Sequence, residues 1–500
     1  LSDRGDQDYF AAGLTDDLIT ELSKVSGLFV IARNSVFALG DQAGVQEAAS
    51  ELGVQYVLEG TFRRTKSTIR INTQLIDVST GRYMWAERYD RDSKDLFFVQ
   101  DDVIDHIIST MSVHLTAAER SELDRIPTAN LEAYDNYLRA EQEGVYFTDV
   151  ESYRRALSYY QRAIELDPNF AEAHAGIARI AVDVWGRDYN FLWSAAVARK
   201  IAYDAAGRAL ELDPRNARGH SVLALLQLVD GRREEAATSA RKAVDLKPND
   251  AEAHGNLGLV LVHSGELEAG VAEVDAALRL DPAPTPFFDL LAGVIYYNAR
   301  NYARAIEQLE PARKALPQSE PAREYLAAAY ARHGDEAKAL LEIGSLLEMF
   351  PAANLAYYDY LYGYWLEEQR AHHLEGLRRA GIPEWPFGFE ADEADRLNEV
   401  ELSALIDNTT WTGRHRNGTP FMQHFDGNGN VAYQSANTFA TGLAYLRADR
   451  LCQRLDGIVP NQPICGYVYR NSVSDTGRNE DYVQVSPNAL QYFSLEEPPG

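Results

Sequence analysis

A proline-containing phrase returns at nearly constant intervals through the middle of the chain. Its prolines are separated by 46, 34, 34, 35 and 34 residues: Pro168, Pro214, Pro248, Pro282, Pro317 and Pro351. A fixed period of this length indicates stacked units, each of which buries its apolar face against its neighbours. Small residues such as Ala236 and Ala243 fall where two helices of a unit must approach closely, and Gly231 marks the turn between them. The pattern predicts an α-helical solenoid.

A period of 34 residues with these small positions is typical of the tetratricopeptide repeat. We expect about six repeats and a capping helix over residues 130–385. The 46-residue interval leaves about twelve extra residues within 182–196. The aromatic side chains of this insertion either cover neighbouring structure or form a ridge that contacts a partner: Trp185, Tyr189, Phe191 and Trp193.

A solenoid of helix pairs presents a concave groove, and such grooves bind extended peptides or helices. Counting from the repeat phase places seven side chains on or near this inner surface: Leu225, Leu228, Val262, His263, Tyr296, Tyr297 and Arg332. A clamp for a C-terminal carboxylate would need clustered lysine, arginine and asparagine there. The mixture instead favours an apolar or aromatic segment of a protein or peptide partner.

The charge balance excludes some partners. With 75 acidic and 48 basic residues the formal net charge is −27, which repels nucleic acid and anionic lipid surfaces. No uninterrupted apolar stretch approaches 18 residues, so we expect no membrane span in this chain. No nucleophile elbow, nucleotide-binding glycine pattern or other catalytic motif is present, and we expect no catalytic residue and no cofactor.

The stretch "HFDGNGNVAYQSANTF" raises the question of a metal site, because Asp426, Asn428 and Asn430 alternate as ligands do in a calcium loop. An EF-hand loop needs glycine at its sixth position and a bidentate glutamate at its twelfth. Val431 and Asn437 stand at those positions. The run "DGNG" between two strand-like segments instead predicts a β-hairpin, and no metal site is expected.

In the first 120 residues the apolar residues have a different periodicity, which predicts an α+β domain. Apolar residues at helical spacing alternate with strand-like runs in the order helix, strand, helix, three strands, helix. The expected elements cover residues 13–25, 27–33, 44–53, 54–62, 68–78, 82–90 and 96–115. The three consecutive strands read as an antiparallel meander.

These segments carry a family resemblance. "YFAAGLTDDLITELSKVSGLFVIARNSVFA", "ELGVQYVLEGTFRR", "INTQLIDVSTG", "MWAERYDRD" and "LFFVQDDV" resemble the TolB-like domain of bacterial class III adenylate and guanylate cyclases, which precedes tetratricopeptide repeats. "HHLEGLRRAGIPEW" (372–385) is similar to the closing segment of those repeat arrays, so the resemblance covers about three quarters of the chain. It implies that a first strand and a cyclase module would lie upstream of Leu1, and that this chain is not itself an enzyme.

The C-terminal segment, residues 390–500, is a separate β domain. About seven short strands separated by glycine, asparagine and aspartate predict a small antiparallel barrel or sandwich. The chain has two cysteines, Cys452 and Cys465, on neighbouring expected strands. They form either a cross-strand disulfide or a pair of reduced thiols.

Three functions fit these parts. The first is a non-catalytic regulatory and protein-interaction region of a cyclase-type signalling protein, which the resemblance implies and for which it favours a homodimer. The second is a self-standing envelope scaffold with no cyclase attached. The third is a sensor that holds a small ligand inside the C-terminal barrel. We expect the periplasmic side of the inner membrane, where the cysteines would be oxidised, with the cytoplasm as the alternative.

Overall fold

The computed structural model describes residues 5–39, 44–64, 68–92, 96–123, 125–145, 150–186, 192–436, 438–455, 463–471 and 480–496. The chain divides into two compact units, residues 1–299 and 300–500. This division falls inside the repeats, between the helices Pro286–Asn298 and Tyr302–Ala315. Among the described residues, no helix is long and apolar enough to span a membrane.

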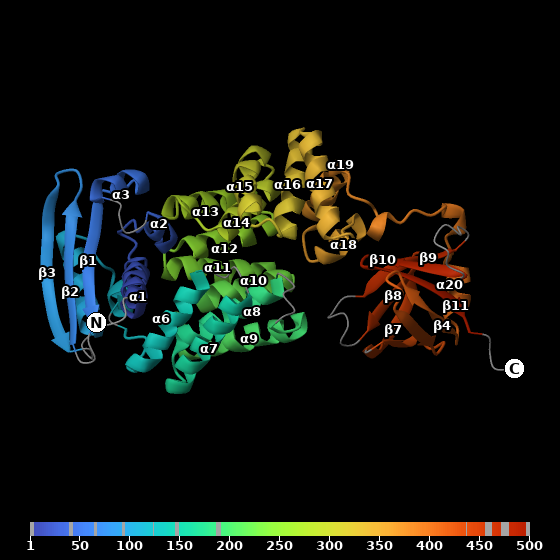
Figure 1. Ribbon diagram of the computed structural model, residues 1–500, viewed down its shortest axis with the longest axis horizontal. Coiled ribbons are helices and arrows are strands. Elements are labelled where there is room, and N and C mark those ends of the chain that lie inside the picture. The colour runs from blue at the N-terminus through green and yellow to red at the C-terminus, as the bar shows by residue number, and fades with distance from the viewer. Residues whose placement is uncertain are drawn as a thin grey trace. The chain divides into compact units, whose positions relative to one another are not determined.

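The first unit begins with helices on one face of a three-stranded sheet (Figure 1). Its elements are α1 Gly5–Leu22, α2 Arg33–Ala38, α3 Val45–Leu52, β1 Tyr56–Arg64, β2 Thr68–Asp77, β3 Arg82–Asp92, α4 Leu96–Thr110 and α5 Ala117–Leu123. The strands pair antiparallel in the order β1-β2-β3, which confirms the predicted meander. Alternate residues of β2, among them Ile69 and Ile71, are buried and share a core with Val99 and Val103 of α4.

The strand predicted at residues 27–33 is wrong. The segment is extended but joins no sheet, and α2 begins at Arg33. Its backbone amides bond elsewhere in the chain, because Ala32 N donates to the carbonyl oxygen of Leu280 at 2.8 Å. Backbone groups of this run are therefore satisfied without a β-ladder, because a distant part of the chain supplies an acceptor.

Four helix pairs and the single helix α14 make up the rest of the described part of the first unit. They are α6 Leu131–Val145, α7 Val150–Leu166, α8 Ala171–Gly186, α9 Ala195–Leu212, α10 Ala217–Val229, α11 Arg233–Leu246, α12 Ala251–His263, α13 Leu267–Leu280 and α14 Pro286–Asn298. Asn216, Asp250 and Thr285 cap the helices that follow the repeat turns. Alanines at the predicted close-approach positions, including Ala236 and Ala243, are buried.

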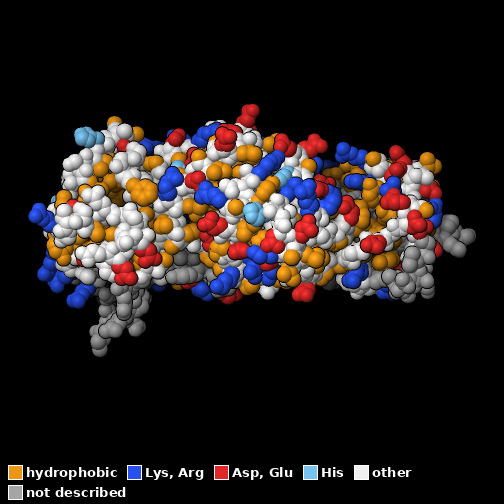
Figure 2. All heavy atoms as spheres, turned by 90° about the horizontal axis from the view of Figure 1, so that it is seen from above, with side chains coloured by type: hydrophobic (Ala, Val, Ile, Leu, Met, Phe, Trp, Pro, Cys, Tyr) orange, Lys and Arg blue, Asp and Glu red, His pale blue; other side chains and the backbone are white. Residues whose placement is uncertain are grey.

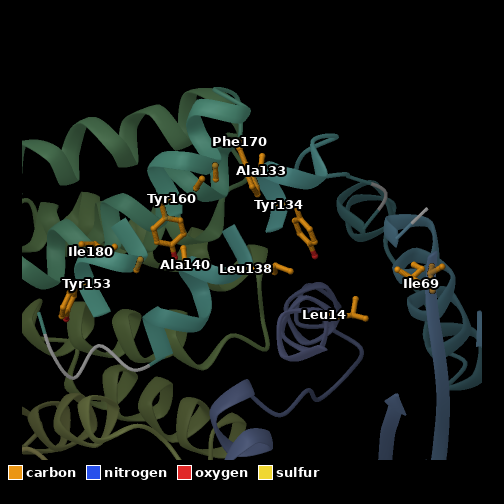
Figure 3. Packing of buried hydrophobic residues seen from close by; sticks show 14 of the residues in the cluster. Leu14, Ile69, Ala133, Tyr134, Leu138, Ala140, Tyr153, Tyr160, Phe170 and Ile180 are labelled. Carbon is orange, nitrogen blue, oxygen red and sulfur yellow. The ribbon is translucent and has the colours of Figure 1, made fainter. Parts of the chain in front are cut away.

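One apolar cluster joins the N-terminal elements to these pairs. Leu14 of α1 lies beside Leu138 of α6, and Tyr134, Tyr160 and Phe170 continue the cluster into the repeats (Figure 3). A Cβ atom on Gly13 would lie 2.9 Å from a methyl carbon of Leu138. The helices α1 and α6 can therefore approach this closely because residue 13 has no side chain. Within the 182–196 insertion, Trp185 and Trp193 are partly buried against the same cores, whereas Tyr189 and Phe191 lie outside the described residues.

The second unit continues with helices and ends in a β-barrel. Its elements are α15 Tyr302–Ala315, α16 Glu320–His333, α17 Glu336–Met349, α18 Leu355–Leu361, α19 Glu367–Ala380, the 3₁₀ turns η2 Pro386–Gly388 and η3 Glu393–Asp395, and α20 Glu399–Ile406. Eight strands follow: β4 Thr410–His415, β5 Pro420–Phe425, β6 Asn430–Ser435, β7 Thr438–Arg447, β8 Arg450–Leu455, β9 Ile464–Arg470, β10 Tyr482–Ser486 and β11 Ala489–Leu495.

These strands close into an antiparallel barrel in which each pairs with its sequence neighbours and β11 returns to β4. The inside is packed with side chains, as in a small barrel whose lumen is a core. Trp411, Phe425, Leu451, Val468 and Phe493 are all buried there, and the Trp411 and Phe493 rings stack at 3.9 Å.

The hairpin predicted at "DGNG" is confirmed. It joins β5 to β6, and Gly427 and Gly429 adopt φ values of 71° and 88°, which other residues rarely reach. The carboxylate of Asp426 closes the turn by accepting hydrogen bonds from the amides of Asn428 and Asn430 at 2.8 and 3.0 Å. The side-chain amide of Asn430 also donates to Asp426 at 2.6 Å, and this bond together with the backbone bonds lowers the pKa of Asp426.

Candidate functional site

The seven inner-surface side chains predicted from the repeat phase lie deeper than expected. Five are buried: Leu228, Val262, His263, Tyr296 and Tyr297. Leu225 of α10 and Arg332 of α16 are half-buried. The reason is visible at Tyr296, whose hydroxyl donates to Asp275 of α13 at 2.6 Å, so its ring packs between helices. Peptide binding at these residues stays a prediction. Of the seven, only Leu225 and Arg332 are partly exposed and could contact a peptide directly.

Charged residues on the first helices of alternate pairs contact one another instead. The guanidinium of Arg218 on α10 donates to both carboxylate oxygens of Glu141 on α6, at 2.5 and 3.0 Å. The hydroxyl of Tyr160 donates to the same carboxylate at 2.6 Å. Burial favours protonated Glu141, but the Arg218 charge and these hydrogen bonds outweigh it and lower the pKa of Glu141 to about 2.

A second ion pair links α8 to α12. The Arg179 guanidinium lies 3.3 Å from the carboxylate of Glu252. Sequence reasoning missed these ion pairs, although two of their members carried a signal. Arg218 and Glu252 occupy the same repeat position, and Glu172 stands at that position one repeat earlier, with spacings of 46 and 34 residues. Recurring charges at one phase of the first helices would have indicated polar contacts between repeats.

The turns between repeats hold the N-terminal segment. Asn249, in the turn after α11, donates its backbone amide to Ser23 O at 3.1 Å and its side-chain amide to Val25 O at 3.0 Å. Its side-chain oxygen accepts from the amide of Val30 at 3.4 Å. One buried asparagine therefore fixes three backbone groups of the stretch between α1 and α2.

The next turn repeats the arrangement with a carboxylate. Asp281 accepts from the amide and hydroxyl of Ser35 at 3.1 and 2.5 Å, and from the side chain of Asn34 at 3.2 Å. The Ser35 hydroxyl also accepts from the amide of Ala283 at 2.8 Å. Ser35 and Asp281 are each 1% exposed. A buried carboxylate with three donors anchors the start of α2 strongly.

Two earlier turns hold the segment that leads into the repeats. Arg125 pairs with Asp213 at 2.7 Å, and the hydroxyl of Thr128 donates to Asp167 at 2.6 Å. Four successive inter-repeat turns, at Asp167, Asp213, Asn249 and Asp281, thus bind residues 23–35 and 125–128. We call these contacts the turn latch. It makes the N-terminal elements and the first repeats one compact unit.

An acidic pair on α1 lies beside this latch. The carboxylate of Asp16 is 3.2 Å from the Arg33 guanidinium, and Asp17 accepts from Gln100 of α4 at 3.3 Å. Burial raises the pKa of Asp16, and burial together with the neighbouring Asp16 charge raises the pKa of Asp17 well above its usual range. Charges of both signs are interspersed with apolar groups over the face drawn in Figure 2.

The remaining predicted site residues are the two cysteines. Cys452 of β8 and Cys465 of β9 are direct partners in the ladder, and a disulfide joins them. Within the described residues, no group of three or more histidine, cysteine, aspartate or glutamate side chains is placed to hold a metal ion.

Comparison with known proteins agrees with the repeat architecture. Residues 200–251, 221–283 and 290–354 match the tetratricopeptide repeat family. The chain contains tetratricopeptide repeats.

A curated relative extends the comparison. The chain is 42% identical over 239 residues to a protein of Rhizobium meliloti (strain 1021) named "Putative adenylate cyclase 3". The match covers 47% of this chain and 40% of the relative, so the chain spans about two fifths of that protein's length.

Solved structures similar to this chain include Pseudomonas aeruginosa PilF, which is 22% identical, with 45% of this chain and 96% of PilF covered and a TM-score of 0.33. Another is YrrB, described as a TPR protein with an unusual peptide-binding site. It is 24% identical, with 39% and 97% covered and a TM-score of 0.24.

Proposed function

We propose that this chain is a non-catalytic, protein-binding regulatory region of a bacterial cyclase-type signalling protein, with a TolB-like N-terminal part. The observation that carries the proposal is the 42% identity over 239 residues to a protein named as an adenylate cyclase. The repeats support the binding role, because stacked helix pairs present extended surfaces to protein and peptide partners.

The turn latch supports a regulatory role. It holds the N-terminal elements on successive turns of the array through Asn249 and Asp281. A partner that changes the spacing of the repeats would therefore strain these buried hydrogen bonds and move the N-terminal elements. In a cyclase-type protein those elements would connect the repeats to the catalytic part. A partner bound to the repeats would therefore alter the activity of the catalytic part.

Location on the periplasmic side of the inner membrane is part of the proposal. The Cys452 to Cys465 disulfide supports it, because such bonds persist in oxidising compartments and are rare in the cytoplasm.

The test is the intact mass of the native protein from its source under non-reducing conditions, with peptide mapping. We expect a mass well above 55.8 kDa, peptides of a cyclase module, and a Cys452 to Cys465 bridged peptide. The purified 500-residue chain should convert no ATP to cyclic AMP. A native mass near 55.8 kDa would instead favour a self-standing scaffold, and cyclase activity of the chain alone would contradict the proposal.

A further inference from the structure

The outside of the C-terminal barrel has two apolar walls, and the chain covers one of them. Outward-facing residues of β9, β10 and β11 form a buried cluster with Trp385, Phe387 and Phe389 of the preceding linker. The Trp385 ring lies 5.6 Å from that of Tyr467, and the Arg416 guanidinium lies 4.4 Å above the Phe387 ring. The linker reads "EWPFGFEADE" (384–393), so a segment with alternating aromatic residues and flanking carboxylates binds this wall.

The opposite wall carries similar side chains but is open. On β5 to β8 the outward positions are every second residue from Pro420, Asn430, Phe439 and Arg450, because the residues between them face the packed interior. We call these positions the free wall. Four large apolar side chains on it are exposed: Phe439 at 71%, Met422 at 44%, Tyr445 at 43% and Leu443 at 42%. Water-facing sides of antiparallel sheets are ordinarily polar, and such a patch indicates an interaction site.

The charge of the free wall is opposite to that of the chain. Its outward positions include Arg447, Arg450 and Arg454 but no aspartate or glutamate, in a chain of net charge −27. Within the described part of the chain, the side chains of Arg447 and Arg454 make no ion pair and no hydrogen bond. The ladder sets Arg454 directly opposite Leu443, so a cation stands beside an apolar side chain.

A hollow of about 400 Å³ lies on this wall, and its lining includes His424, Thr441, Leu443 and Arg454. Asp426 is the one carboxylate at its edge, and the hairpin amides already occupy that group. The hollow has room for one or two large side chains.

We propose that the free wall docks an acidic peptide segment with alternating large apolar residues, of the same chemistry as the linker on the covered wall. Apolar side chains of the segment pack on Phe439, Leu443 and Met422, and its carboxylates pair with Arg454 and Arg447. The proposal does not rest on the function proposed for the repeats.

The test uses the whole chain and a fluorescein-labelled peptide with the sequence of residues 384–393. We expect saturable anisotropy changes that weaken with added salt. Arg454→Glu should weaken binding at least about tenfold, because it replaces the attraction with repulsion. Arg414→Glu, the same change at an exposed position of β4, should alter binding less than about twofold. Leu443→Ser should weaken binding, whereas Val400→Ser on exposed α20 should not.

Hydrogen exchange of the wild-type chain provides a readout that does not depend on variants. The peptide should protect amides of β5 to β8 and leave those of β9 to β11 unchanged. The proposal fails if the peptide does not bind, if Arg414→Glu weakens binding as much as Arg454→Glu, or if protection falls on β9 to β11. It also fails if a ten-nucleotide oligouridylate binds more tightly than the peptide, or if the chain dimerises through the wall and excludes the peptide.

Discussion

Glu324 of α16 and His373 of α19 share a hydrogen bond of 2.6 Å between Oε1 and Nε2, and their side chains are 1% and 0% exposed. The Tyr362 hydroxyl donates to the same carboxyl group at 2.9 Å. Burial raises the pKa of Glu324 to about 8 and lowers that of His373 to about 3. At neutral pH the pair is therefore a carboxylic acid that donates to a neutral imidazole, because neither charge can be hydrated there.

This pair predicts a stability plateau between pH 4.5 and 6.5, the unfolded pKa values of the two groups. The stability from Glu324 is full below its unfolded pKa and is lost as pH rises toward 8. The stability from His373 is full above its unfolded pKa and is lost as pH falls toward 3. Each limb should slope by at most about 1.4 kcal/mol per pH unit. Urea unfolding across this range measures the profile.

Glu324→Gln is the informative variant for the alkaline limb. Its amide can still donate to His373 but does not titrate, so the loss of stability above pH 6.5 should shrink relative to the parent. An unchanged alkaline limb in this variant would mean that other groups produce it.

A second prediction concerns the repeat position of His373. Steps of 34 or 35 residues back along the chain reach Ala339, Ala305, Gly270 and Ala236, so a histidine stands where the other repeats have a small residue. His373→Ala should nevertheless destabilise the second unit by about 2–4 kcal/mol, because it leaves a cavity and removes the partner of a buried acid. His372→Ala, at the half-buried neighbour, should cost less than about half as much. Equal effects on the urea midpoint would contradict this reasoning.

Features set by residues close together in the sequence were mostly predicted, whereas contacts between segments far apart in the sequence were not. Repeats, hairpin and seven of the eight barrel strands are specified by periodicity and turn residues within a few tens of positions, and these were predicted. The strand β11 was not predicted, and the sequence left open whether the strands form a barrel or a sandwich. Adjacent residues of a helix point in different directions, and His372 accordingly contacts Tyr302 at 3.2 Å while His373 contacts Glu324. These features depend on helix and strand geometry alone.

Contacts between distant segments were not predicted. The stretch at residues 27–33 has the composition of a strand, but its hydrogen-bond partners, Asn249 and Leu280, lie about 220 to 250 positions later in the sequence. No local pattern marks a turn as a docking site. The depth of Tyr296 and Val262 was missed for the same reason, since burial depends on which helix packs against each position.

The turn latch gives a third prediction. Asp281→Ala should leave the donors of Ser35 and Asn34 without an acceptor and weaken the latch by about 1.5–3 kcal/mol. Amides of residues 33–38 should then exchange about ten- to a hundredfold faster. Asp245→Ala, at an exposed site one repeat earlier, is the matched control. If Asp281→Ala left exchange in α2 unchanged, the carboxylate would not be what anchors it.

The disulfide gives a fourth prediction. Cys452 and Cys465 close a loop with a sequence separation of 13, for which the loss of unfolded-state entropy contributes about 3 kcal/mol. A Cys452→Ser, Cys465→Ser variant should unfold at a lower temperature than the oxidised parent and at about the temperature of the reduced parent. The helices of the first unit should be unaffected, which circular dichroism during the same melt would show. Equal melting of oxidised and reduced parent would contradict a stabilising bond.

The last prediction concerns Gln423, which faces the barrel interior between Phe421 and Phe425 and is 0% exposed. Neither end of its amide has a hydrogen-bond partner within the described residues. A buried amide without partners costs about 1–3 kcal/mol, so Gln423→Leu, of similar volume, should stabilise the barrel by that amount. Gln434→Leu, on the exposed side of the adjacent strand, should change stability by less than about 0.5 kcal/mol. If Gln423→Leu instead destabilised the barrel, the amide would be satisfied by ordered water in solution, because removal of its hydrogen bonds would then carry a cost.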